Sequence, residues 1–81
     1  QEIILSVDSS VAFYFKQRSI LPEQKIVREL GSGELLVSSK INHDMQLFPL
    51  IRFWLPNIKV VQPLELQHKL ESGLKKYLRL E

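Results

Sequence analysis

The fold is decided by the stretch Glu34–Pro63, which reads ELLVSSKI-NHDMQLFPLIRFWL-PNIKVVQP. Residues 34–41 alternate in character with the two-residue period of a half-buried strand. Residues 42–55 place apolar side chains at helical spacing, so that one stripe of a helix is apolar. Ile58, Val60 and Val61 are β-branched, and Pro63 ends that run. The stretch therefore predicts a strand, a helix and a second strand.

The residues before and after this stretch predict four further elements. Residues 1–7 alternate as a strand, and Asp8 and the serines after it offer N-cap oxygens to a helix. On that helix Val11, Tyr14, Phe15 and Arg18 are expected to share one side. Residues 24–30 read as a second strand, which Gly31-Ser32-Gly33 joins to the central strand in a hairpin. A helix over residues 64–80 ends the chain.

The predicted order is β-α-β-β-α-β followed by a terminal helix. Right-handed crossovers place both crossover helices on one face of a four-stranded antiparallel sheet. The sequence thus predicts an α+β fold of the ferredoxin-like type with an added C-terminal helix. Its 81 residues make one domain, 1–81. Many unrelated functions use this fold, so the fold alone decides no activity.

Composition narrows the possible settings without naming a function. The chain has 44% hydrophobic and 25% charged residues, as ordinary globular domains do. The net charge of +2 is too weak to indicate nucleic-acid binding by itself. The chain has no cysteine, which excludes disulfides and thiolate metal sites and fits a reducing compartment. No apolar run approaches a membrane span. We expect a cytoplasmic domain cut from a longer protein.

The order of several landmarks resembles a known family. These landmarks are the helix VAFYFKQR, the Pro22-x-Gln24 element, the strand-turn-strand GSGELLVSSKI, and LIRFWLPNIKVVQPLELQHKL. Together they are similar to the C-terminal extension, or WCX domain, that follows the WYL domain in bacterial transcriptional regulators. The resemblance covers nearly the whole chain. It implies upstream DNA-binding and WYL domains that lie outside this sequence.

The resemblance also implies partners. In such regulators an N-terminal winged helix binds DNA, and the extension packs against the other domains and helps to form the dimer. The expected partners are therefore a second copy, as a homodimer, and the upstream domains of the same regulator. DNA is expected to be bound by the full-length protein rather than by this domain, and no membrane is involved.

No residue pattern indicates catalysis or a metal site. The sequence has no nucleophile elbow, glycine-rich phosphate loop or paired-carboxylate signature. His43 and His68 are the only histidines, and their spacing brings in no third ligand. His43 is expected to cap a helix and His68 to lie on a solvated face. Acylphosphatase-like enzymes share this fold, but Asp8-Ser9-Ser10 stands where their glycine-rich anion loop would lie. We predict no enzymatic activity and no cofactor.

An RNA-recognition module is the closest alternative, because it uses the same strand order. Such modules stack bases on aromatic side chains displayed by the central strands. None of the residues expected on the sheet face opposite the helices is aromatic: Ile4, Ser6, Leu36, Ser38, Lys40, Lys59 and Val61. Base stacking is therefore disfavoured, and the apolar members of this face suit contact with protein.

Two sets of candidate residues follow. The interface candidates are apolar residues without an obvious cover: Ile4, Phe13, Leu36, Phe53, Trp54 and Val61. Arg18 and Arg52 lie on or beside apolar helical stripes, where their stems cover the core, or where their guanidinium groups bind phosphate or carboxylate. The sequence thus favours a non-catalytic regulatory and dimerisation domain. The alternative is an effector-binding module that contacts a nucleotide or single-stranded nucleic acid.

Overall fold

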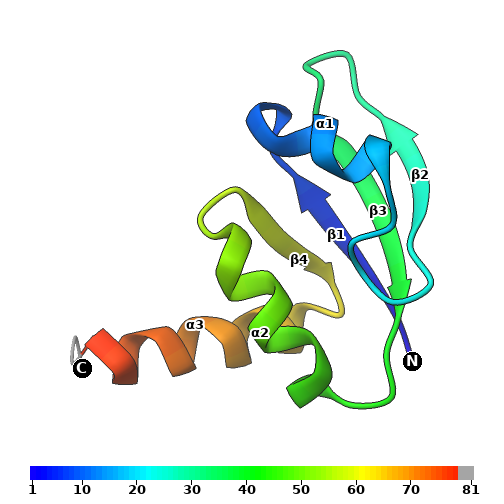
Figure 1. The fold of residues 1–81 in the computed structure, drawn as a ribbon. Coiled ribbons are helices and arrows are strands. Elements are labelled where there is room, and N and C mark those ends of the chain that lie inside the picture. Colours follow the sequence, from blue (N-terminus) through cyan, green and yellow to red (C-terminus); the bar gives the residue numbers. More distant parts are fainter. Residues whose placement is uncertain (79–81) are drawn as a thin grey trace.

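The structure, a computed structural model, describes residues 1–78 and shows seven elements of secondary structure (Figure 1). In chain order they are β1 (Glu2–Val7), α1 (Ser9–Gln17), β2 (Lys25–Glu29), β3 (Leu35–Lys40), α2 (Asp44–Trp54), β4 (Ile58–Gln62) and α3 (Leu64–Leu78). The predicted order of elements is therefore confirmed. The last two residues of the predicted terminal helix lie outside the described residues.

The four strands form one sheet in the order β2-β3-β1-β4, and every neighbouring pair is antiparallel. The central pair is regular, with Ile3 opposite Ser39 and Val7 opposite Leu35. In each edge strand the register shifts by one residue, which leaves one residue without a partner on the neighbouring strand. This extra residue is Val27 in β2 and Val61 in β4. The α+β class is confirmed, and the topology is compatible with the ferredoxin-like arrangement.

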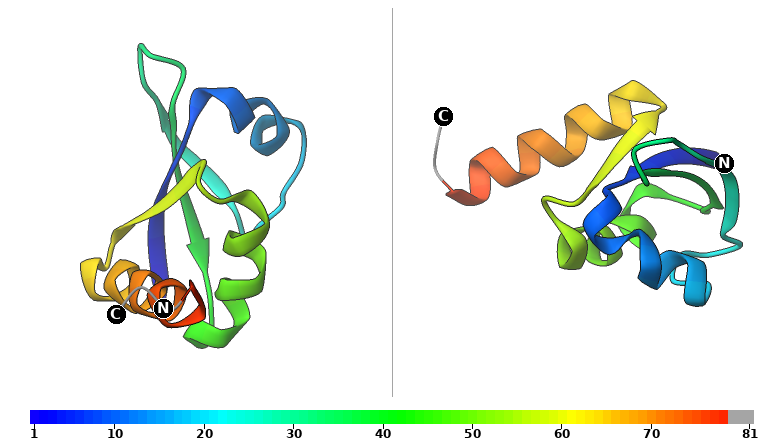
Figure 2. Two further views of the ribbon diagram at one scale, coloured as in Figure 1. Left: turned by 90° about the vertical axis from the view of Figure 1, so that its left-hand side faces the viewer. Right: turned by 90° about the horizontal axis from the view of Figure 1, so that it is seen from above.

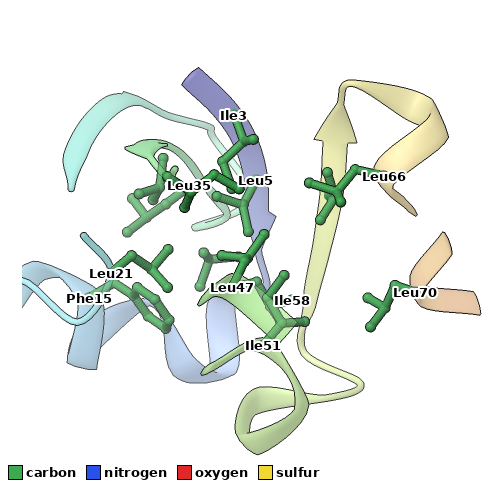
Figure 3. Packing of buried hydrophobic residues seen from close by; sticks show 14 of the residues in the cluster. Ile3, Leu5, Phe15, Leu21, Leu35, Leu47, Ile51, Ile58, Leu66 and Leu70 are labelled. Carbon is green, nitrogen blue, oxygen red and sulfur yellow. The ribbon is translucent and has the colours of Figure 1, made fainter. Parts of the chain in front are cut away.

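One face of the sheet is covered by α1 and α2, which lie on the same side of it (Figure 2). Alternate residues of β1 and β3 supply the strand side of the core, because every second side chain points to the same face. Phe15 of α1 and Ile51 of α2 pack onto them, as Figure 3 shows. The fully buried side chains with the largest volumes include Phe15, Ile3, Leu5, Leu35, Leu47, Ile51 and Leu66.

Asp8 caps α1 as predicted. Its carboxylate accepts hydrogen bonds from the backbone N–H of Ser10, at 3.0 Å, and from the Ser10 hydroxyl. These bonds favour the charged form, so the Ser10 hydroxyl and then the Ser10 N–H lower the pKa of Asp8 below its ordinary 3.8. The side chain is fully exposed.

Gln24 secures the other end of α1 and the loop after it. Its amide nitrogen donates to the carbonyl of Phe15 at 2.9 Å. Its amide oxygen accepts from the backbone N–H groups of Ile20, at 3.0 Å, and Leu21, at 3.2 Å. One side chain thus satisfies backbone groups that the end of a helix leaves without partners. The carbonyl of Pro22, two residues earlier, accepts from the Ser39 hydroxyl on β3.

Pro49, inside the apolar pattern of residues 42–55, predicted a helix that starts near it or bends there. Helix α2 instead begins at Asp44 and continues through Pro49. Proline is tolerated best in the first turn of a helix, where the N–H groups have no intrahelical acceptor. Pro49 lies only just beyond that turn. His43 occupies the N-cap position, but its side chain makes no capping hydrogen bond.

The third helix, α3, lies along the β4 edge of the sheet and projects beyond it (Figure 2). The Gln67 side-chain oxygen accepts from the backbone N–H of Val60 at 2.9 Å, in a buried hydrogen bond. This bond supplies an acceptor to a donor that an edge strand would otherwise leave open. Leu66 and Leu70 join the core, whereas Tyr77 is 83% exposed. The sequence predicted one apolar stripe along this helix, formed by Leu66, Leu70, Leu74, Tyr77 and Leu78. Its first members are buried and Leu74 partly so, whereas Tyr77 and Leu78 at its end are exposed.

The opposite edge of the sheet, β2, has no such cover. All five of its residues are exposed, against the alternation expected for a half-buried strand. Its irregularity at Val27 interrupts the run of free backbone groups, which is one way that edge strands resist pairing with other chains. The hairpin to β3 is confirmed, with Gly33 at φ 94°, a value that favours glycine.

Candidate interaction surfaces

Four aromatic side chains on α1 and α2 form one continuous surface, which we call the aromatic cluster: Phe13, Tyr14, Phe53 and Trp54. Ring centroids are 5.9 Å apart for Phe13 and Tyr14, and 5.7 Å apart for Tyr14 and Trp54. The centroids of Phe53 and Trp54 are 5.2 Å apart, with nearly perpendicular rings. These separations are typical of favourable aromatic pairs. The C-terminal end of α2 is thereby joined to α1.

The aromatic cluster packs on the core through Trp54 and exposes its other rings to solvent. Trp54 is half-buried and packs on the buried ring of Phe15, with a centroid distance of 5.0 Å. Phe13 is 62% exposed and Phe53 78% exposed. From the sequence, Phe13, Phe53 and Trp54 cannot all be internal in so small a domain, and some of them are expected in the core. Of the three, only Trp54 is buried, and only in part. Tyr14, expected beside Phe15 on the covered side of α1, is instead 52% exposed and belongs to the cluster.

The other three interface candidates lie on β-strands. Ile4 and Leu36 are half-buried and point away from α1 and α2, because their neighbours in sequence fill the core. Ile4 is opposite Ser38, and Leu36 is opposite Ser6. Val61 is the extra residue of β4 and is 46% exposed. The predicted interface residues therefore do not form one surface: three belong to the aromatic cluster, Ile4 and Leu36 lie on the opposite side of the sheet, and Val61 lies at the irregularity of edge strand β4.

Arg52 lines a groove between α2 and α3. The groove has a volume of about 370 Å³, and its other lining residues are Leu55, Gly73, Leu74 and Tyr77. A Cβ atom built on Gly73 would lie 4.0 Å from Nη2 of Arg52, so the guanidinium lies over this glycine. Within residues 1–78 the Arg52 side chain has neither an ion pair nor a hydrogen bond. The groove thus combines apolar walls, a phenol ring and an unpaired cation.

Arg18, the second predicted ligand-binding residue, lies elsewhere. It is the exposed C-cap residue of α1 and is not among the residues that line the Arg52 groove. The structure therefore does not bring the two arginines together in that groove. Sequence reasoning missed Gly73 and Tyr77 as its lining. In the sequence, only their positions hint at a shared surface, because residues four apart lie on the same side of a helix.

Two further observations concern the described part of the chain. Among residues 1–78, no three His, Asp or Glu side chains gather as metal ligands would. None of the helices described is long and apolar enough to cross a bilayer.

Comparison with known protein families agrees with the family resemblance noted from the sequence. No curated protein matches the chain. The family model of the WCX domain matches residues 1–78. Two features that carry the resemblance have structural roles, because Gln24 secures the end of α1 and the segment after Pro63 holds the Gln67 contact to β4. The chain belongs to the WCX domain family, whose members are associated with WYL-type regulators.

Proposed function

We propose that this chain is a non-catalytic regulatory and self-association domain of a cytoplasmic bacterial transcriptional regulator, built on a ferredoxin-like fold. Its partners are a second copy and the upstream domains of the same protein. Those upstream domains, rather than this one, contact DNA. Membership of the WCX family supports the regulatory setting.

The observation that carries the proposal is the aromatic cluster. Monomeric proteins rarely leave large contiguous apolar patches in water, and aromatic residues are enriched in the centres of interfaces. Phe53 and Phe13 are exposed by 78% and 62% although each touches another ring. The four ring side chains carry no charge, and Lys16, three residues after Phe13 on α1, is paired with Glu29 at 2.8 Å. Two copies of an uncharged aromatic surface can meet without bringing like charges together.

Sedimentation velocity over a range of concentrations tests the proposal. The wild-type chain should show a mass that rises with concentration, and Phe53→Ser should weaken association by about 2 kcal/mol, roughly thirtyfold. Met45→Ser is the matched control, because Met45 is also exposed on α2, at 71%, and lies eight residues before Phe53, near the other end of the helix. A monomeric wild type well above micromolar concentration would remove the self-association part of the proposal. Equal losses in both variants would remove the cluster's role.

One observation favours a second candidate, an effector-binding module that contacts a nucleotide. The groove between α2 and α3 offers the Arg52 guanidinium to a phosphate and the Tyr77 ring to a base. Arg18 is not part of this groove, so the candidate depends on Arg52 alone.

Gly73→Ala is a direct test of this second candidate. The added methyl group enters the groove beside Arg52, while alanine stabilises a helix interior by about 1 kcal/mol relative to glycine. A lower affinity for adenosine monophosphate in a more stable protein would therefore indicate a groove that binds ligand. Ser72→Ala is the control, because Ser72 is the neighbouring α3 residue and does not line this groove. An affinity unchanged by Gly73→Ala would exclude the groove as the nucleotide site.

A further inference from the structure

The sheet face that α1 and α2 leave uncovered carries charged residues as well as the apolar residues Ile4 and Leu36. The strand pairings place ten residues on this face, which we call the open sheet face: Glu2, Ile4, Ser6, Lys25, Arg28, Leu36, Ser38, Lys40, Lys59 and Gln62. The third helix does not cover it, because α3 lies against β4 at the edge. The sequence predicted the β1, β3 and β4 members, apart from Glu2 and Gln62, but missed both β2 residues. It was wrong to place Val61 here, because Val61 is the unpaired extra residue of β4 and Gln62 lies opposite Ile4 instead.

The charges of the open sheet face are predominantly positive. Lys25 and Arg28 lie on edge strand β2, Lys59 lies on edge strand β4, and Lys40 ends β3. All four are exposed, and within residues 1–78 none has an ion pair or a side-chain hydrogen bond. The face therefore has a cationic rim on three sides.

Only two carboxylates offset this rim. Glu2 is opposite Lys40, and Glu34 accepts a hydrogen bond from the Ser6 hydroxyl at 3.3 Å at the end of the face. The ten residues of the face include four basic side chains and Glu2, and with the adjacent Glu34 counted as well their charge is +2, which equals the net charge of the whole chain. The remaining surface is therefore neutral in sum, and the excess positive charge is concentrated here.

The centre of the open sheet face contains two apolar side chains and small serines. Ile4 and Leu36 are half-buried, and the small side chain of Ser38 between the strands is only 5% exposed. None of the ten residues is aromatic, so the face has no ring on which a nucleic-acid base would stack. Its apolar centre inside a charged rim is the usual anatomy of a protein interface.

We propose that the open sheet face docks an amphipathic, acidic segment of another protein, whose apolar side covers Ile4 and Leu36 and whose carboxylates meet the cationic rim. This inference rests on the proposed function only in taking the domain to work through contacts with protein. A second copy meeting this face with its own open sheet face is disfavoured, because eight basic side chains would then gather around one interface. The aromatic cluster has no such obstacle.

The probe is a fluorescein-labelled synthetic peptide with leucine at helical spacing and glutamate at the other positions. Its binding to the 81-residue chain is measured by fluorescence anisotropy. Three further probes isolate its features: the same peptide with lysine in place of glutamate, the same peptide with serine in place of leucine, and a labelled oligothymidylate. The acidic amphipathic peptide should bind most tightly, and added salt should weaken it.

Two pairs of variants locate the site. Arg28→Gln with Lys59→Gln should weaken the acidic peptide about tenfold or more, because both sides of the rim lose a charge. Lys75→Gln with Lys76→Gln is the matched control, since it removes the same charge from the exposed last turn of α3. Leu36→Ser should also weaken binding, whereas Met45→Ser should not. Circular dichroism of each variant separates lost binding from lost folding.

Several results would overturn the inference. These are tighter binding of oligothymidylate than of the peptide, equal binding of the serine-substituted peptide, equal losses in the two charge pairs, or no binding in the millimolar range. The outcome is independent of self-association. If the chain is monomeric and still binds the acidic peptide, the docking proposal stands and the self-association proposal fails. If the chain associates and binds no peptide, the self-association proposal stands and the docking proposal fails.

Discussion

The aromatic cluster and the open sheet face lie on opposite sides of one sheet and differ in the kind of contact they favour. The cluster exposes large uncharged rings, with Phe53 78% exposed, and Lys16, on the same helix as Phe13, is paired with Glu29. The open sheet face has smaller, half-buried apolar groups, Ile4 and Leu36, inside a rim of unpaired cations. Apolar surface is abundant on the first, and charge is concentrated on the second.

This difference shows that apolar exposure alone does not identify a partner. Self-association requires a surface that tolerates its own copy, which an uncharged aromatic surface does and a cationic face does not. A partner of different sequence can supply the opposite charge and gains specificity from it. A domain with both surfaces can hold its own copy on one side and a different protein segment on the other.

The largest expected effect concerns the support of the aromatic cluster. Phe15→Ala removes the buried ring beneath Trp54 and should lower the free energy of unfolding by about 3–5 kcal/mol. Chemical denaturation measures this loss, and Trp54 fluorescence should shift to longer wavelength as the indole gains water. Phe15→Leu gives a milder test if the alanine variant does not fold. A loss below 1 kcal/mol would mean that the cluster does not depend on this ring.

The sequence predicted the strand residues at the centre of the open sheet face but not the basic residues on its β2 edge, and the reason is physical. Alternation along β1 and β3 predicted correctly which residues face away from the helices, because side-chain direction in a strand has a fixed period. It did not predict Lys25 and Arg28, because the register of an edge strand with an extra residue follows from pairing rather than from its own pattern. The excess positive charge of the open sheet face is therefore visible only in the structure.

The aromatic cluster was only partly predictable. Sequence reasoning singled out Phe13, Phe53 and Trp54, since so many aromatic residues cannot all be internal in a small domain. Tyr14 was wrongly assigned to the covered side of α1. A helix as short as α1 can place its apolar residues against the sheet in several orientations, and its sequence does not decide between them. The groove residues Gly73 and Tyr77 were not identified, because the packing of α3 on the β4 edge depends on the contact between Gln67 and Val60.

A second prediction separates the two surfaces from the general stability of the fold. Gln67→Ala removes the acceptor for the buried N–H of Val60 and should cost about 1–3 kcal/mol in denaturation experiments. Neither self-association nor peptide binding should change under native conditions, because Gln67 belongs to neither surface. Gln62→Ala, a change of an exposed glutamine in β4, is the control and should cost much less. A loss of either contact in a folded Gln67→Ala protein would show that the surfaces depend on α3.

A third prediction compares one residue from each surface. Leu36→Ser removes a half-buried side chain and should cost about 1 kcal/mol of stability, whereas Phe53→Ser removes an exposed one and should cost less than about 0.5 kcal/mol. In association experiments the order should reverse, with Phe53→Ser the more damaging. Denaturation and sedimentation of the same two variants give both comparisons. Equal effects in sedimentation would contradict the assignment of self-contact to the aromatic cluster.

The smallest expected effect is a pH dependence that acts on the two surfaces in different ways. Asp8 caps α1, which carries Phe13 and Tyr14, and the Ser10 hydroxyl and N–H hold its pKa below the ordinary 3.8. A carboxylate with a lowered folded-state pKa contributes stability that is fully present above its unfolded pKa. That contribution is lost as the pH falls through the folded-state pKa. The helix that carries half of the aromatic cluster should therefore weaken below pH 3.8.

Asp8→Asn isolates this contribution, because asparagine is an equally good N-cap residue and does not titrate. The stability advantage of the wild type over Asp8→Asn should be largest near neutral pH and should shrink as the solution is acidified below 3.8. Salt should reduce it, since the carboxylate is exposed. Asp8 is not among the residues of the open sheet face, so this contribution should affect the aromatic cluster rather than that face. A difference between the two proteins that stays constant with pH would show that the cap acts through its hydrogen bonds alone.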